Sequence, residues 1–286
     1  MVDLRLNTNM QNIIVNPLLR EIHKRNRKSL LVRFPELANA SNGEYLALIK
    51  YINHKPECFF SLNTFETFLI WIQDRDMESR FEFREYLNNN TVKLDQAFFH
   101  LKEVNNLSWH DYFEKLDEYE FIRFIDKEIH PSYLRLVEGV LEHFIHAVAY
   151  YSRISRGKGT DGLDIWSIVQ ELSFTSLSEV VKPYNHLVRN GIAHGGITFL
   201  QNMVKYRDKK GNEETYNDSE VIRLFDDLLD VCNGLALALS LFFLTHQKDG
   251  YNVPRELLLD ELRESTRTLG GKFWDVHHRN LPILNN

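Results

Sequence analysis

Arg189-Asn190-Gly191-Ile192-Ala193-His194-Gly195-Gly196 is the stretch of the chain that says most about its fold. The run before it, Ser178–Val188, has helical character with Pro183 early in it. Glycine is the residue type that most often ends a helix in the left-handed conformation. The sequence therefore predicts a helix that ends before Gly195 and keeps His194 in its last turn.

Three polar side chains of this helix can address one ligand. Asn190 and His194 are four residues apart and share a helix face. Arg189 lies about 140° around the helix from His194, at roughly 100° per residue, so its long side chain is needed to reach the same site. The negative end of the helix dipole favours a protonated His194, whereas the positive charge of Arg189 opposes protonation. The sequence leaves open which of the two influences is larger.

Arginine, asparagine and histidine together suit the cleavage of an RNA phosphodiester without a metal. A histidine that moves a proton contributes roughly 10²–10⁴ in rate. Arginine can hold the extra negative charge of the phosphorane in a bidentate clamp, and asparagine can orient a group or donate to a phosphate oxygen. Cleavage needs both a base and an acid, and this segment offers one histidine. A symmetric dimer would supply the second.

With its three intervening residues, Arg189-Asn190-x-x-x-His194-Gly195 resembles the R-x4–6-H motif, in its Arg-Asn form, of the HEPN superfamily of helical domains. The surroundings are similar too. A long helix (Ser132–Ser155) and a loop precede the motif helix, and a hairpin-like stretch and an apolar helix (Ser219–His246) follow it. The resemblance covers Ser132–His246, less than half of the chain, and only the motif is specific.

The resemblance implies a metal-independent endoribonuclease without a cofactor, whose products end in a 2′,3′-cyclic phosphate and a 5′-hydroxyl. His194 would be the acid–base residue, Arg189 the phosphate clamp and Asn190 the positioning residue, in a composite site shared by two chains of a homodimer. Such domains recur in bacterial toxins, abortive infection and other anti-phage systems, so an antitoxin or regulatory protein is a further expected partner. The alternatives are a non-catalytic HEPN scaffold that binds RNA, a nucleotide or a protein, and, more remotely, a hydrolase that uses a metal.

The long helix offers supporting residues for the same site. Glu138, Glu142 and His146 recur every four residues, away from the apolar stripe of this helix. Glu138 or Glu142 could orient His194 or Arg189, with His146 as a further supporting residue, or the three could simply form a solvated face. His143 and His146 form an H-x-x-H pattern, but helical metal pairs more often use a spacing of four, and no third ligand lies nearby in the sequence. We therefore expect no metal site.

Strand-forming residues follow the motif. Ile197–Leu200 and Met203–Asp208 favour strands, Asp208–Asn212 favours a turn, and Glu213–Tyr216 favours a returning strand. The sequence predicts a protruding β-hairpin here. The cations of this hairpin could contact the backbone of RNA while its tyrosine stacks a base, or all of them could belong to an ordinary solvated hairpin. The residues are Lys205, Tyr206, Arg207, Lys209 and Lys210.

The predicted fold class is mainly α: a HEPN-type helical bundle with a small β-hairpin insertion, preceded by a second helical region. Three parts are expected, namely residues 1–131, a helical region without a recognisable motif; 132–246, the HEPN-like domain; and 247–286, a partly helical extension. In the first part, helical patterns cover 16–28, 43–53, 65–72, 79–87 and 94–104, and Asn88–Asn90 predicts a loop.

Composition favours a folded cytoplasmic protein. Hydrophobic residues make up 43% of the chain, which is ample for a core. Cys58 and Cys232 are far apart and do not have the spacing of a disulfide or a metal site. No signal peptide is evident. The longest apolar run, Gly234–Leu244, is too short to span a bilayer. The net charge of −6 argues against a large basic surface for nucleic acid, but a local site needs only a few cations.

Overall fold

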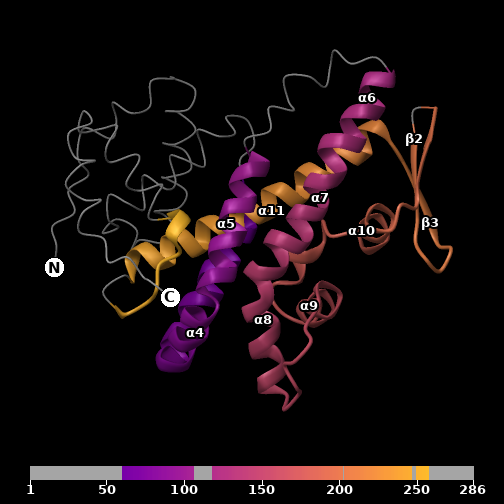
Figure 1. Ribbon diagram of the computed structural model, residues 1–286. Coiled ribbons are helices and arrows are strands. Elements are labelled where there is room, and N and C mark those ends of the chain that lie inside the picture. Colours follow the sequence, from indigo (N-terminus) through magenta and orange to yellow (C-terminus); the bar gives the residue numbers. More distant parts are fainter. Residues whose placement is uncertain (1–59, 106–117, 202, 247–248, 258–286) are drawn as a thin grey trace, which may run out of the picture.

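The part of the chain that the structure describes is mainly helical, with one small antiparallel sheet at its edge (Figure 1). The computed structural model describes residues 60–105, 118–201, 203–246 and 249–257. The prediction of a mainly α fold with a small β insertion is thereby confirmed. The helices predicted at 16–28 and 43–53, and most of the C-terminal extension, lie outside the described residues.

One long helical rod crosses the molecule. It is made of α6 (Glu118–Phe124), α7 (His130–Leu136) and α8 (Glu142–Ser155), joined by π-helical turns η4 (Ile125–Ile129) and η5 (Val137–Leu141). The start predicted at Ser132 is therefore too late, because the backbone stays helical through both π turns and no cap interrupts it. π-Helical turns are rare and often lie at functional sites.

The rod shares one hydrophobic core with three further helices: α4 (Leu62–Asn89), α5 (Thr91–Asn105) and α11 (Asp218–Thr245). The apolar helix predicted at Ser219–His246 is confirmed as α11. Its start is fixed by Asn217, whose side chain accepts from the Glu220 N–H while the Glu220 carboxylate accepts from the Asn217 N–H. In Figure 1, α11 crosses behind α5 and α7.

Helix α4 is longer than the patterns suggest. It runs through the predicted segments 65–72 and 79–87, with one interruption at Ser79 (φ −152°, ψ 58°). Asn88 and Asn89 are helical, so the loop predicted at Asn88–Asn90 shrinks to Asn90 alone. The Asn90 side chain donates to the carbonyl of Tyr86, which lets α5 begin directly. The predicted domain boundary after residue 131 stays a prediction, although described residues on both sides of it share the core.

The sheet follows the motif helix α10 (His186–Ala193) in the order β1 (Ile197–Leu200), β2 (Met203–Arg207) and β3 (Glu213–Asn217). All neighbouring strands are antiparallel. The predicted hairpin is confirmed as β2 and β3, and β1 adds a third strand. Buried positions alternate with exposed ones along β2, as expected for a sheet with one face on the core.

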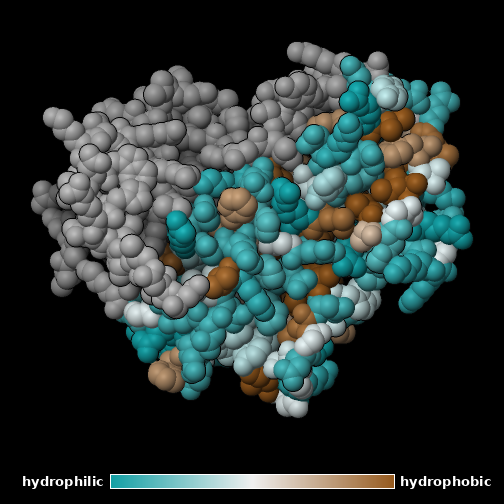
Figure 2. Space-filling view, viewed as in Figure 1, coloured by the Kyte–Doolittle hydropathy of each residue, from teal (hydrophilic) through white to brown (hydrophobic). Residues whose placement is uncertain are grey.

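Two short helices connect the rod to α10: α9 (Ile165–Leu172), which no pattern predicts, and the 3₁₀ turn η6 (Ser178–Val181). Figure 2 shows a mainly hydrophilic face, with hydrophobic side chains gathered between the upper part of the rod and the sheet. Within the described ranges, none of the helices is both long enough and apolar enough to cross a membrane.

Candidate functional site

The motif helix begins later than predicted. Residues 178–181 form the 3₁₀ turn η6, and α10 starts only at His186, where the Asn185 side chain accepts from the Val188 N–H at 2.9 Å. Pro183 lies between the two elements and lacks a backbone donor, so a continuous helix from Ser178 would lose a hydrogen bond there. The Asn185 cap offers the backbone a better start.

The start of α10 is fastened to both the rod and the sheet. The Asn185 N–H donates to the Tyr133 hydroxyl of α7 at 3.0 Å. The Asn185 amide nitrogen donates to Glu214 at 2.7 Å and lies 2.9 Å from the Tyr216 hydroxyl, both on β3. Asn185 therefore joins the start of α10 to α7 through its backbone N–H and to β3 through its side chain, which fixes the orientation of α10.

Glycines bring the end of α10 against β2. A Cβ on Gly191 would lie 3.1 Å from the Tyr206 Cβ, and a Cβ on Gly196 would lie 2.0 Å from the Arg207 carbonyl oxygen. Gly195 has φ 71°, the left-handed conformation expected for the residue that ends the helix. His194 itself is the C-cap (φ −115°, ψ 10°) and is exposed, just beyond the last turn in which it was predicted.

Arg189 is held by two partners. Its Nε and Nη2 donate to Glu138 Oε1 at 2.9 and 2.6 Å, and its Nη1 donates to the Asn190 side-chain oxygen at 2.8 Å. Glu138 comes from the π turn η5, so the rod and α10 meet at this ion pair. The structure thus brings together Arg189, Asn190 and Glu138 of the predicted site residues.

A second histidine of α10 joins this network. The Asn190 amide nitrogen lies 2.9 Å from His186 Nε2, and the Tyr184 hydroxyl lies 3.0 Å from His186 Nδ1. Since Arg189 donates to the Asn190 oxygen, the amide nitrogen must face His186 and donate to Nε2. A neutral His186 then carries its proton on Nδ1 and donates to Tyr184. Partial burial, followed by the Arg189 charge, lowers the pKa of His186, which agrees with a neutral ring.

His186 is not among the residues predicted from the sequence. It stands four residues before Asn190 and eight before His194, so the same helical spacing that links Asn190 to His194 could have found it. Its ring also contacts Trp166 of α9, with ring centroids 4.2 Å apart. Since no pattern predicts α9, the Trp166 contact could not be anticipated.

Glu142 lies close enough to the motif to feel its charge. Partial burial raises the pKa of the Glu142 carboxyl, the charges of Glu138 and Asp164 raise it further, and the Arg189 charge opposes them. Among the described residues, Glu142 makes no hydrogen bond through its carboxyl group. It is therefore an electrostatic neighbour of Arg189 and not a ligand of it.

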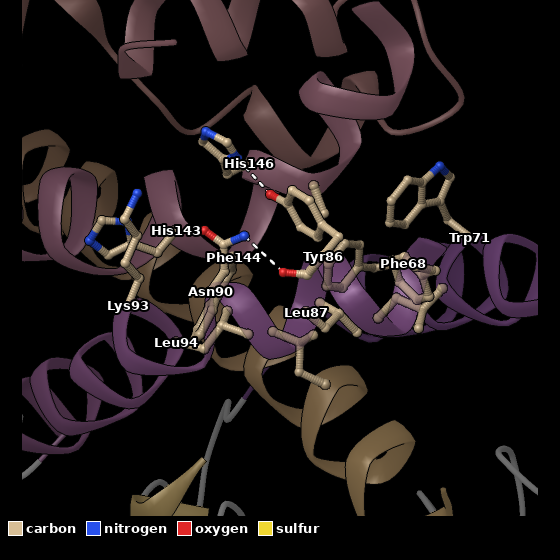
Figure 3. Close-up of a pocket in the computed structure, with 14 residues that line it drawn as sticks. Phe68, Trp71, Tyr86, Leu87, Asn90, Lys93, Leu94, His143, Phe144 and His146 are labelled. Atoms are coloured by element: carbon tan, nitrogen blue, oxygen red, sulfur yellow. Dashed lines mark hydrogen bonds between the residues drawn. The ribbon is translucent and has the colours of Figure 1, made fainter. Parts of the chain in front are cut away.

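His146 is directed elsewhere, so its predicted place beside the motif is wrong. Its Nδ1 lies 2.6 Å from the Tyr86 hydroxyl of α4, in a pocket between α4, α5 and α8 (Figure 3). Burial and the neighbouring charges of Lys93 and His143 lower the pKa of His146. The tyrosine of α4 offers this histidine a partly buried partner that the periodicity of one helix cannot reveal.

The hairpin residues divide into three groups. Tyr206 is fully buried and its hydroxyl lies 2.8 Å from His130 Nε2, so the prediction that it stacks an RNA base is wrong. Lys205 and Arg207 pair with Glu213 at 2.6 and 3.7 Å. Lys209 and Lys210 are exposed in the turn, and the Lys210 charge reaches His186, whose pKa it lowers.

The His194 ring is open to a ligand. Among the described residues it has no hydrogen-bond or ion-pair partner, whereas Arg189, Asn190 and His186 are each held by neighbours. In that same part of the chain, no group of three or more His, Cys, Asp or Glu side chains is placed to bind a metal ion. Models of known protein families, curated proteins and solved structures give no match to this chain.

Proposed function

We propose that the chain is a HEPN-type endoribonuclease that cleaves RNA without a metal. The observation that carries the proposal is an oriented arginine five residues before an exposed histidine in the chain. Arg189 is oriented by Glu138 and Asn190, and His194 stands at the helix end with its ring accessible. Preorganised cations of this kind stabilise the charge that develops in a transition state.

In the proposed reaction, His194 takes the proton of a 2′-hydroxyl. The freed oxygen attacks the adjacent phosphorus, the bond from phosphorus to the 5′-oxygen breaks, and a 2′,3′-cyclic phosphate forms. A protonated group returns a proton to the departing 5′-oxygen. Arg189 retains N–H groups beyond those used by Glu138 and Asn190, because a guanidinium has five, and these would hold the phosphorane oxygens.

The acid is proposed to come from a second copy of the chain. His186 is an unsuitable acid because its Nε2 accepts from Asn190 and its Nδ1 proton is directed to Tyr184. A homodimer that places two His194 rings at one phosphate would supply a base and an acid together. If the site is shared, mixing inactive His194→Ala chains with wild type lowers the cleavage activity by a larger fraction than the fraction of mutant chains in the mixture. A loss strictly proportional to the fraction of mutant chains contradicts sharing.

The biological setting is proposed from the family resemblance alone. HEPN ribonucleases of this motif recur in bacterial toxin, abortive-infection and anti-phage systems, and an antitoxin or regulatory protein would restrain such an activity. The cytoplasm, where RNA is the substrate, is the compartment that fits this setting.

A non-catalytic scaffold is the competing function, and one observation favours it. Each of the three guanidinium nitrogens of Arg189 already has a protein acceptor, as in an arginine that serves only packing. The same residues would then recognise RNA, a nucleotide or a protein without chemistry. Such a scaffold binds its ligand but leaves RNA intact.

Cleavage of mixed RNA in excess EDTA separates the two functions. Wild type, Arg189→Lys and His194→Ala are compared, with Lys182→Ala as a matched control, since Lys182 is an exposed cation that pairs with Glu179. We expect cleavage by wild type and Lys182→Ala, and a loss of about 10²-fold or more in the other two. Equal cleavage by wild type and His194→Ala contradicts the proposal, and cleavage that requires added metal favours a metal-dependent hydrolase.

A further inference from the structure

An exposed tryptophan borders the candidate site. Trp166 lies in the first turn of α9, where Asp164 caps the helix by accepting from the Ser167 N–H at 2.9 Å. Its neighbours Ile165 and Ile168 are buried in the core, but Trp166 itself is 43% exposed. Burial of the exposed part of this large apolar ring against a ligand or a partner would be favourable, so Trp166 is a candidate contact residue.

The Trp166 ring is tied to the catalytic network. Its centroid is 4.2 Å from that of His186, with the ring planes inclined by 41°. His186 in turn lies 2.9 Å from the amide of Asn190, which accepts from Arg189. Trp166 is therefore only two side chains away from the proposed phosphate clamp.

Charges of both signs act on the His186 ring that Trp166 contacts. The Arg189 and Lys210 charges both lower the pKa of His186, so both cations act on the ring that Trp166 contacts, with Asp208 and Asp164 opposing them. Lys210 is exposed in the turn between β2 and β3. Proteins bind single-stranded nucleic acid by stacking a base on an aromatic face while nearby cations meet the phosphates.

We infer that Trp166, braced by His186, is the stacking platform for a base next to the cleaved linkage. The inference rests on the proposed function, since it assigns a subsite to that same reaction. Only an unpaired base offers a free face to this ring, whereas both faces of a base inside a duplex are covered by its neighbours. The subsite therefore selects linkages in unpaired RNA.

A protein partner is the other occupant that an exposed tryptophan could have. The surroundings favour RNA, because the ring that Trp166 contacts, His186, belongs to the hydrogen-bonded network of the proposed phosphate clamp Arg189. Oligomeric state measured by sedimentation therefore accompanies the binding test. A change of oligomeric state in Trp166→Ala with unchanged oligonucleotide binding overturns the inference.

The test is equilibrium binding of a fluorescein-labelled, fully 2′-O-methylated single-stranded oligonucleotide, which cannot be cleaved because its 2′-oxygens carry no proton. Wild type is compared with Trp166→Ala and Trp166→Phe. Tyr119→Ala serves as the control, because Tyr119 is a 68% exposed aromatic on α6. We expect about ten-fold weaker binding by Trp166→Ala, near wild-type binding by Trp166→Phe, and no change in Tyr119→Ala.

An oligonucleotide with abasic positions adds a readout that a folding defect would not produce. If Trp166 stacks a base, wild type and Trp166→Ala bind the abasic strand with equal affinity. Equal binding of the intact strand by wild type and Trp166→Ala overturns the inference. If wild type cleaves RNA in EDTA but Trp166→Ala binds the intact strand as wild type does, the inference fails and the proposed function stands. If wild type leaves RNA intact but Trp166→Ala still binds the strand more weakly, the proposed function fails and the stacking role stands.

Discussion

Replacing Gly196 by alanine tests the packing that sets His194 at the end of α10. A Cβ at this position would lie 2.0 Å from the Arg207 carbonyl oxygen, against about 3.5 Å for an ordinary contact. The obstacle is backbone, so β2 must move away by more than about 1 Å. The hydrogen bond from the Arg207 N–H to the Gly196 carbonyl, at 2.7 Å, cannot survive that shift.

The expected cost follows from these two losses. A hydrogen bond contributes about 0.5–1.5 kcal/mol, and overpacking costs about 1–3 kcal/mol, so the free energy of unfolding should fall by about 1.5–4.5 kcal/mol. Gly195→Ala meets open space but keeps φ 71°, which costs about 1–2 kcal/mol. Gly159→Ala meets open space at an ordinary φ and should change stability by less than about 0.5 kcal/mol.

Urea unfolding followed by far-ultraviolet circular dichroism measures all three variants at the same pH. The expected order of destabilisation is Gly196, then Gly195, then Gly159. A Gly196→Ala protein as stable as Gly159→Ala refutes the described contact between the motif and β2.

Three further outcomes are expected. Asn185→Ala removes the cap of α10 and its bonds to β3, so the free energy of unfolding should fall by about 1–2 kcal/mol in urea, and an unchanged midpoint contradicts this role. Burial lowers the pKa of His130 from 6.5 to about 4 against the opposing charge of Asp126, so the folded state binds fewer protons than the unfolded state. Wild type should therefore lose on the order of 3 kcal/mol of stability as the pH falls from 6.5 to about 4, and His130→Gln, compared by urea unfolding at each pH, should lose clearly less. Glu138→Gln breaks a partly exposed ion pair, so the free energy of unfolding should change by less than about 1 kcal/mol. RNA cleavage should fall at least roughly 10-fold, because Arg189 loses the partner that orients it. Full cleavage activity in this variant would assign Glu138 to the solvated face.

Local patterns predicted the elements whose signals lie within one segment. The apolar run specifies α11, and the turn Asp208–Asn212 specifies the hairpin, since its Asp208 carboxylate accepts from the backbone and side chain of Asn212. Gly195 ends α10 as expected because few other residues adopt its positive φ at low cost. These features depend on a few neighbouring residues.

Features that depend on distant partners were not predictable. The start of α10 depends on Asn185, whose anchors lie on α7 and β3, and His146 is drawn to Tyr86 of α4. Tyr206 reads from the sequence as an exposed strand aromatic, but His130 of the rod binds its hydroxyl in the core. In each case the decisive contact joins residues far apart in the chain.

The candidate site was predictable in the same unequal way. For Glu138 the sequence left two alternatives, a contact with the motif or a solvated face, and the structure shows the contact with Arg189. The four-residue spacing identifies a face of the helix but does not say what packs against that face. His186 follows the helical spacing of Asn190 and His194, whereas Trp166 enters only through α9. The three-residue motif is therefore part of a larger network that includes Glu138, His186 and Trp166.

The most direct measurement of the central claim is the chemical nature of the RNA ends produced by purified protein in EDTA. The proposed attack by a 2′-oxygen, with His194 as base and Arg189 as clamp, predicts 2′,3′-cyclic phosphate and 5′-hydroxyl ends from wild type and none from His194→Ala. Ends with a 5′-phosphate and a 3′-hydroxyl, or RNA left intact by wild type, would contradict it.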